Sequence, residues 1–146
     1  MGVDATLSEL ENLWSIYNHY PAIATIDTDI VIEYFREYTY MSLGAMLSHK
    51  LLQYDRDLRK NHVIGELDGI FHILDSQRLL IDDIDILFNP AYDIDILGYF
   101  VRLGRNRKII VNWPGEYSSG YLSYALPGYE DYKIYRAKNY DVICIV

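Results

Sequence analysis

The sequence predicts an α/β protein, with a three-layer, mostly parallel sheet, helices on both faces and antiparallel strands in the C-terminal part. Short, continuous apolar runs, typical of strands buried on both faces, alternate with amphipathic helical patterns. The runs at residues 79–81 and 109–111 are the clearest of these strands. After residue 115 the pattern changes to short strand-like segments separated by Pro-Gly and polar turns, which favours antiparallel pairing.

The first half of the chain begins with a helical pattern. Apolar side chains recur at helical spacing over residues 7–20, with Thr6 or Ser8 as the expected cap. Residues 22–26 are apolar and β-branched and predict a buried strand. A second helix is expected over residues 30–38, although its β-branched residues also suit a strand. Asp29 is the expected cap of this helix.

The middle of the chain is expected to contain one more strand and two helices. Tyr40–Leu43 predicts the strand, and Gly44 a turn into a helix over residues 45–58. Basic residues at the end of this helix would complement its dipole: Arg56, Arg59 and Lys60. Residues 63–74 form a further amphipathic helical pattern, which contains two glycines.

The rest of the chain predicts strands around one more helix. Residues 78–85 form a strand that ends in acids, 94–103 a helix that ends at Gly104, and 108–113 a second apolar strand. Three short strands are expected in the tail, and they would extend the sheet in antiparallel or edge pairings: residues 120–125, 133–135 and 141–146.

Length and composition predict one acidic domain over residues 1–146. The formal net charge is −8, from 13 Lys and Arg against 21 Asp and Glu, which argues against binding nucleic acid over the whole surface but leaves room for a local basic patch. The single cysteine, Cys144, excludes an intramolecular disulfide and a multi-cysteine zinc cage. With no long apolar run and an acidic first segment, a cytoplasmic protein without a membrane span is expected.

Tyrosine is over-represented, with 15 Tyr against 4 Phe and 2 Trp. A tyrosine buries a large ring but needs a partner for its hydroxyl, so it is favoured at half-buried strands and at interfaces. The excess therefore indicates either a protein-binding surface or a compositional bias that also favours Ile, Asn and Asp.

One candidate site lies at the end of the strand Leu79–Ile81. A hydrophobic run followed by Asp82 and Asp83 matches the Walker B pattern of P-loop NTPases, in which the first acid holds Mg²⁺ and the next orients the attacking water. The alternative is that these acids open a solvated loop.

The companion phosphate-binding loop, G-x-x-x-x-G-K-[ST], is absent from the sequence. Residues 25–32 stand in its place and contain no glycine and no lysine, whereas Asp27 and Asp29 would repel phosphate. No bound cofactor is therefore expected, and Mg-ATP would be one only if the site were completed in another way.

A basic cluster precedes the second apolar strand and contains Arg102, Arg105, Arg107 and Lys108. It would suit an acidic partner, a phosphate or nucleic-acid contact, or an arginine finger offered to a neighbouring subunit. The alternative is a solvated helix C-terminus, where cations are favoured anyway.

No metal site or nucleophile is predicted. The four histidines are not spaced as metal ligands usually are, and the sequence contains no G-x-S-x-G motif.

Between about Tyr40 and Tyr135 the chain resembles the BrxF family, the small P-loop proteins of type 3 BREX phage-defence systems. The resemblance is carried by Tyr40–Ser48, Leu79–Pro90, Asp95–Leu97, Leu103–Arg107, Ile109–Gly115 and Gly120–Tyr132. It implies a P-loop-NTPase-like fold and a role in antiviral defence. Under it, Asp82 and Asp83 match the Walker B acids and, with Asn112, form a vestigial Mg²⁺ or nucleotide site. Arg105 and Arg107 match a basic motif, while the family's Walker A loop is lost.

Three functions are consistent with these patterns. The first is a non-catalytic accessory or assembly subunit of a BREX-like defence system that binds other defence proteins and could form homo-oligomers. The second is an ATPase or nucleotide sensor completed by oligomerisation, with Arg105 or Arg107 reaching into a neighbour. The third is an adaptor that contacts DNA through residues 102–108 or through a partner.

Overall fold

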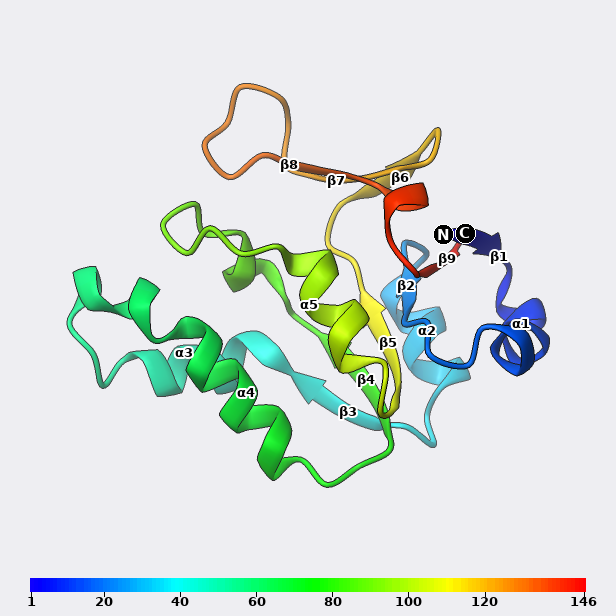
Figure 1. The fold of residues 1–146 in the computed structure, drawn as a ribbon, viewed down its shortest axis with the longest axis horizontal. Helices are drawn as coiled ribbons and strands as arrows, with labels where there is room; N and C mark the ends of the chain where they lie inside the picture. The colour runs from blue at the N-terminus through cyan, green and yellow to red at the C-terminus, as the bar shows by residue number, and fades with distance from the viewer.

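The computed structural model describes residues 1–146, which form two sheets and flanking helices (Figure 1). The larger sheet is parallel throughout, in the order β1-β9-β2-β5-β4-β3, and the smaller is antiparallel, in the order β6-β7-β8. The strands are β1 (Val3–Ala5), β2 (Ala22–Ala24), β3 (Thr39–Ser42), β4 (Arg78–Asp82), β5 (Lys108–Asn112), β6 (Glu116–Ser118), β7 (Tyr121–Tyr124), β8 (Lys133–Arg136) and β9 (Ile143–Ile145).

Helices cover both faces of the parallel sheet, as the apolar strands predicted. The α-helices are α1 (Leu10–Ile16), α2 (Thr28–Tyr34), α3 (Leu43–Leu51), α4 (Val63–Ile73) and α5 (Ile96–Leu103). The 3₁₀ helices are η1 (Leu7–Glu9), η2 (Arg56–Asn61), η3 (Asp85–Phe88) and η4 (Ala137–Asn139). The longest, α4, has 11 residues, and none has the length and apolar character of a membrane span.

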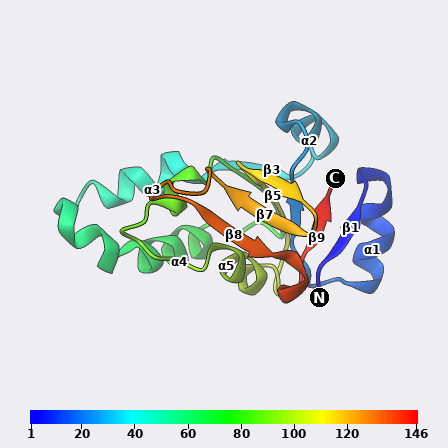
Figure 2. The same ribbon diagram turned by 90° about the horizontal axis from the view of Figure 1, so that it is seen from above.

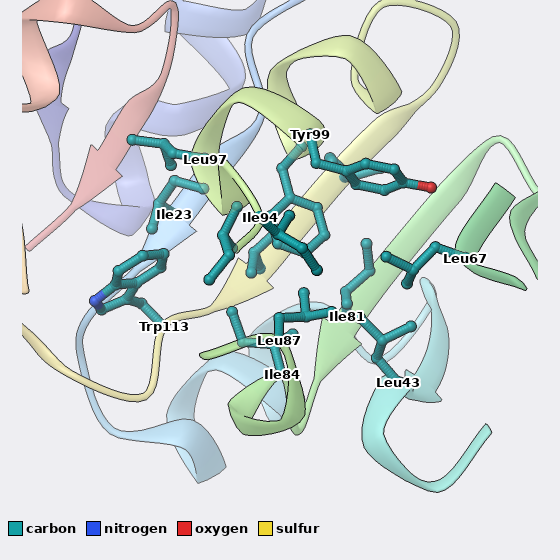
Figure 3. Close-up of a cluster of buried hydrophobic side chains, with 14 of the residues drawn as sticks. Ile23, Leu43, Leu67, Ile81, Ile84, Leu87, Ile94, Leu97, Tyr99 and Trp113 are labelled. Carbon is teal, nitrogen blue, oxygen red and sulfur yellow. The ribbon is translucent and has the colours of Figure 1, made fainter. Parts of the chain in front are cut away.

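The two faces have separate cores, because alternate side chains of a strand point to opposite sides. On one face, α3, α4 and α5 pack over Ile81 and Val111 in the larger core (Figure 3). On the other, α1 and α2 pack over Leu80 and Ile110. The central strands β2, β5 and β4 are therefore buried on both sides, which explains why their sequences lack a polar alternation.

The tail differs from the prediction that it extends the sheet with antiparallel strands. Its last strand, β9, is parallel and lies between β1 and β2, where Ile143, Cys144 and Ile145 are completely buried. The antiparallel strands β6, β7 and β8 form a separate sheet above the ends of the main strands (Figure 1, Figure 2). The three consecutive apolar residues of β9 are more stable inside the sheet, where both faces are covered, than at its edge.

Several helix boundaries also differ from the prediction. The helix expected over 45–58 is already formed at Leu43, without a turn at Gly44, and ends at Leu51. Beyond it the apolar side chains no longer face the core, since Leu52 is 69% and Leu58 45% exposed, and η2 follows as a separate 3₁₀ helix. In α2 the capping residue is Asp27 and not Asp29, which lies in the first turn. The first helix, which was expected to continue to residue 20, ends at Ile16.

Candidate functional site

The carboxyl ends of four parallel strands bring the predicted acidic residues together. In the sheet register Ala24 pairs with Asn112, and Ser42 pairs with Asp82. Ile81 pairs with Val111, and Asp82 and Asn112 are the next residues of these two strands, so they are also neighbours across the sheet. The side chains of Asp82 and Asn112 point to the face covered by α1 and α2, because they lie two residues after Leu80 and Ile110, which point to that face. Ligands of parallel sheets collect at this edge.

Both Walker B-like acids are engaged by the neighbouring strand β3. The Tyr40 hydroxyl donates to Asp82 Oδ2 at 2.7 Å, and the Ser42 hydroxyl donates to Asp83 Oδ2 at 2.7 Å. The hydrogen bond to Asp82, with burial and the nearby charges, raises the pKa of Tyr40 to about 12. One oxygen of each carboxylate is thus already occupied within the chain.

Asp83 and Gly44 hold the start of α3 against the end of β4. Asp83 has a left-handed backbone (φ 57°), and its carbonyl accepts a hydrogen bond from the Gly44 N–H at 2.8 Å. A Cβ at position 44 would lie 2.5 Å from Asp83 Oδ2 and 2.9 Å from its carbonyl oxygen. Only glycine permits this approach, so the conformation of the acidic turn depends on Gly44.

Asn112, at the end of β5, is the one buried residue that is neither apolar nor aromatic. It is 6% exposed, and neither its Oδ1 nor its Nδ2 has a hydrogen-bond partner in the chain. Most buried polar groups are paired, because an unpaired one costs about 1–3 kcal/mol. Asn112 is thus a buried amide beside Asp82 whose polar atoms have no partner within the chain.

The turn between β2 and α2 carries an anion at the start of the helix. One carboxylate oxygen of Asp27 accepts hydrogen bonds from the backbone N–H groups of Asp29, at 2.9 Å, and Ile30, at 3.3 Å. N–H groups at the start of a helix, such as these, are donors that can bind a phosphate. The side chain of Asp27 satisfies them without any ligand.

The antiparallel sheet packs against the same edge. The Trp113 indole N–H donates to the Ser123 carbonyl at 2.9 Å, and the Tyr124 ring stacks on Phe88 with centroids 3.9 Å apart. The Tyr124 hydroxyl donates to Asp85 at 3.1 Å. Strand β7 thus fixes both the segment after β5 and the segment after β4, and it encloses this part of the edge.

The predicted basic patch is at the opposite edge of the sheet, where β4 and β5 begin. Arg107 donates one NH₂ group to the Leu74 carbonyl and the other to the Phe71 carbonyl, each at 2.9 Å. These are carbonyls at the end of α4, where a helix leaves its last carbonyls without partners. Arg107 is therefore a structural residue that neutralises a helix C-terminus.

The other three cations of the cluster have different surroundings. Arg102 lies 5.9 Å from the centre of the Tyr99 ring, and Lys108 lies 5.2 Å from that of Trp14. Arg105 is exposed and borders a shallow hollow of about 350 Å³ that also contains Arg78 and His19 and has no acidic residue. Because the hollow is at the amino ends of the strands, the cluster does not reach Asp82 within one chain.

The sequence did not predict where the tyrosine hydroxyls bind. Six of them donate to carboxylates of the same chain, in the pairs Tyr40–Asp82, Tyr54–Glu66, Tyr99–Asp68, Tyr117–Asp4, Tyr124–Asp85 and Tyr140–Asp95. Much of the tyrosine excess therefore has an intramolecular role. The joint excess of Tyr and Asp was the only signal in the sequence, and it does not specify pairs.

The remaining reactive groups form no site. Burial raises the pKa of the Cys144 thiol to about 12, so the thiolate is scarce at neutral pH. No group of three or more His, Cys, Asp or Glu side chains is placed to hold a metal ion. The predicted site at the carboxyl edge thus consists of two carboxylates that are bonded within the chain and one unpaired amide. No protein-family model matches the sequence, and no curated protein or solved structure matches the chain.

Proposed function

We propose that this chain is a non-catalytic accessory or assembly subunit of a bacterial, BREX-like anti-phage defence system, acting in the cytoplasm by binding protein partners. The defence setting rests on the resemblance to the BrxF family. The observation that carries the non-catalytic part is the Asp27 carboxylate on the N–H groups that begin α2. A phosphate would have to displace this anion and would meet no lysine in its place.

The rest of the carboxyl edge supports the same proposal. The order of the parallel strands, with β5 between β2 and β4, is compatible with a P-loop-like sheet. In such a sheet Asp82 and Asp83 correspond to Walker B acids, yet one oxygen of each already accepts a hydrogen bond within the chain. Tyr40 and Ser42 therefore give these acids a structural role that would persist after loss of nucleotide binding.

Isothermal titration with Mg-ATP tests the absence of a nucleotide site. No micromolar binding that depends on both Mg²⁺ and Asp82 is expected. Micromolar affinity that is lost in Asp82→Ala, or ATP hydrolysis by the assembled complex that Asp82→Ala abolishes, would instead establish the ATPase or sensor alternative. The unpaired amide of Asn112 is the observation that favours that alternative.

Affinity purification from the native host, followed by mass spectrometry, tests the assembly role. The products of neighbouring defence genes are expected to co-purify with the chain. The exposed tyrosines of the antiparallel region, Tyr121 and Tyr129, are the first residues to replace with alanine, and Tyr34 on α2 is the matched control. A chain that purifies alone, without any defence protein, would refute the proposal.

A second candidate is a DNA-contacting adaptor, favoured by the hollow around Arg105 that has no acidic residue. Binding through phosphates would weaken steeply with salt. Arg78→Ala combined with Arg105→Ala should then reduce DNA affinity and its salt dependence, without removing the structural Arg107. Salt-independent binding, or binding unchanged by the double substitution, would refute this role.

A further inference from the structure

A second basic hollow lies away from both sites described above, between η2 and the loop after η3. It has a volume of about 610 Å³, within the usual range of small-molecule pockets. Both segments lie toward the left side of the molecule in Figure 1. Arg56, Arg59 and Lys60 contribute three cations from η2, and Asn89 and Tyr92 line the other side.

Arg59 is held in position by its surroundings. Its Nε donates to the Tyr54 carbonyl at 3.2 Å, and the Tyr54 ring is stacked on His62 with centroids 3.9 Å apart and planes 4° from parallel. The Tyr54 hydroxyl also donates to Glu66 at 3.2 Å. One edge of the guanidinium is thus anchored, while its two terminal NH₂ groups have no acceptor in the chain.

The other polar groups of the hollow are mainly donors. Asn89 Oδ1 accepts a hydrogen bond from the Ala91 N–H at 3.0 Å, which leaves the Asn89 NH₂ group as a donor. Asp57 is the one acid in the lining, and it forms no ion pair with the three cations. The hollow therefore carries a net positive charge in a chain whose net charge is −8.

We propose that this hollow binds a small phosphate monoester, of the size of a sugar phosphate or a nucleotide. The free NH₂ groups of Arg59 match the spacing of two phosphate oxygens, and Arg56 and Lys60 add positive charge. Tyr92, which packs on the larger core, supplies an apolar wall for the organic part. Such a ligand would need neither Mg²⁺ nor the carboxyl edge, so the proposal does not rest on the function proposed above.

Titration of the protein with ribose 5-phosphate, ribose and inorganic phosphate, followed by NMR and calorimetry, tests the site. Ribose 5-phosphate is expected to bind with a dissociation constant of about 1 mM or tighter. Inorganic phosphate should bind more weakly, and ribose not measurably. Equal binding of ribose and ribose 5-phosphate would refute a phosphate site, and equal binding of phosphate and its ester would refute the role of the apolar wall.

The variants locate the binding. Arg59→Ala should weaken ribose 5-phosphate binding about tenfold or more, and Arg59→Lys should restore it only in part, because an ammonium group cannot bind two oxygens in the same way. Arg59 also contacts Tyr54, so its loss could disturb the local structure. The double variant Arg56→Ala, Lys60→Ala changes two exposed residues and keeps the hydrogen bond between Arg59 and Tyr54.

Arg105→Ala and Asp82→Asn are the controls, at the opposite edge and at the carboxyl edge. Neither should change the binding of ribose 5-phosphate. Unchanged binding in both the Arg59→Ala and the Arg56, Lys60 variants would overturn the proposal, and so would an equal loss in Arg105→Ala. A loss of binding that instead follows Mg²⁺ and Asp82 would contradict the function proposed above.

Discussion

Single tyrosines define much of the chemistry at the carboxyl edge of the sheet. Tyr40 binds Asp82, and Tyr124 binds Asp85 while its ring covers Phe88. In each pair a neutral hydroxyl donates to a carboxylate, a type of hydrogen bond that is stronger than one between neutral groups. The acids are thereby fixed within the fold, and the tyrosines hold their protons more tightly than free tyrosine does.

Asp82→Asn is expected to lower the pKa of Tyr40 from about 12 toward the ordinary value of 10.0, because it replaces the carboxylate whose hydrogen bond contributes most to the shift and also removes its charge. The change in the Tyr40 pKa is measured as the difference in tyrosinate absorbance between the parent and Asp82→Asn during an alkaline titration. Asp83→Asn should have a smaller effect, since Asp83 acts on Tyr40 only through its charge. An unchanged titration in Asp82→Asn would show that the hydrogen bond does not form in solution.

At the scale of elements, the ends of the helices determine which charged residues are free. Asp27 caps α2, Asp95 accepts from the Gly98 N–H at the start of α5, and Arg107 caps the end of α4. Each of these residues satisfies backbone groups that a helix end leaves unpaired. The charges that remain without a partner, such as those of Arg59 and Arg105, are therefore the better candidates for ligand contact.

Arg107→Ala should destabilise the protein by about 2 kcal/mol, because it leaves two carbonyls at the end of α4 without charged donors. Arg107→Lys should recover only part of the loss, since one ammonium group does not replace two NH₂ groups at fixed spacing. Urea unfolding measures both. Arg105→Ala, at an exposed position, is the control and should change stability by less than about 0.5 kcal/mol. Equal effects of the Arg105 and Arg107 substitutions would contradict the capping role.

Gly44→Ala should destabilise the junction of β3 and α3 by about 1–3 kcal/mol, as the added Cβ meets Asp83. This is the opposite of the helix-propensity expectation, which favours Ala over Gly by about 1 kcal/mol. Gly65→Ala in α4 is the matched control, because no atom lies within 4 Å of its added Cβ, and it should stabilise the protein. Thermal unfolding that shows a gain for both variants would refute the close approach of Gly44 to Asp83.

At the scale of the whole molecule, the charges are sorted by the two edges of the parallel sheet. The carboxyl edge collects Asp82, Asp83 and Asp85, and the amino edge collects Arg78, Arg105 and Arg107. The basic edge coincides with the ends of α4 and α5, whose dipoles favour cations. Part of this polarity is therefore a consequence of the fold and is not by itself a sign of a partner.

The tyrosine–carboxylate pairs predict that stability falls in alkaline solution. The pKa values of Tyr40 and Tyr124 are raised to about 12 in the folded chain, so it keeps protons that the unfolded chain loses above about pH 10. Their contribution is complete below that pH and is lost as the pH rises toward 12. Unfolding temperatures measured across this range should decline, and less steeply in Tyr124→Phe, which keeps the ring on Phe88. A decline as steep in Tyr124→Phe as in the parent would exclude Tyr124 as its cause.

The local pattern of the sequence determined the α/β class, the central strands at residues 22–24, 78–82 and 108–112, and the helices α4 and α5, because burial imposes a characteristic spacing on apolar residues. It also placed Asp82, Asp83 and Asn112 at strand ends, and so at one edge. Only the tertiary structure decided that β9 is parallel and central, that Arg107 caps α4 and that Arg59 stands in a hollow. These depend on pairings between residues far apart in the chain, for which local spacing carries no information.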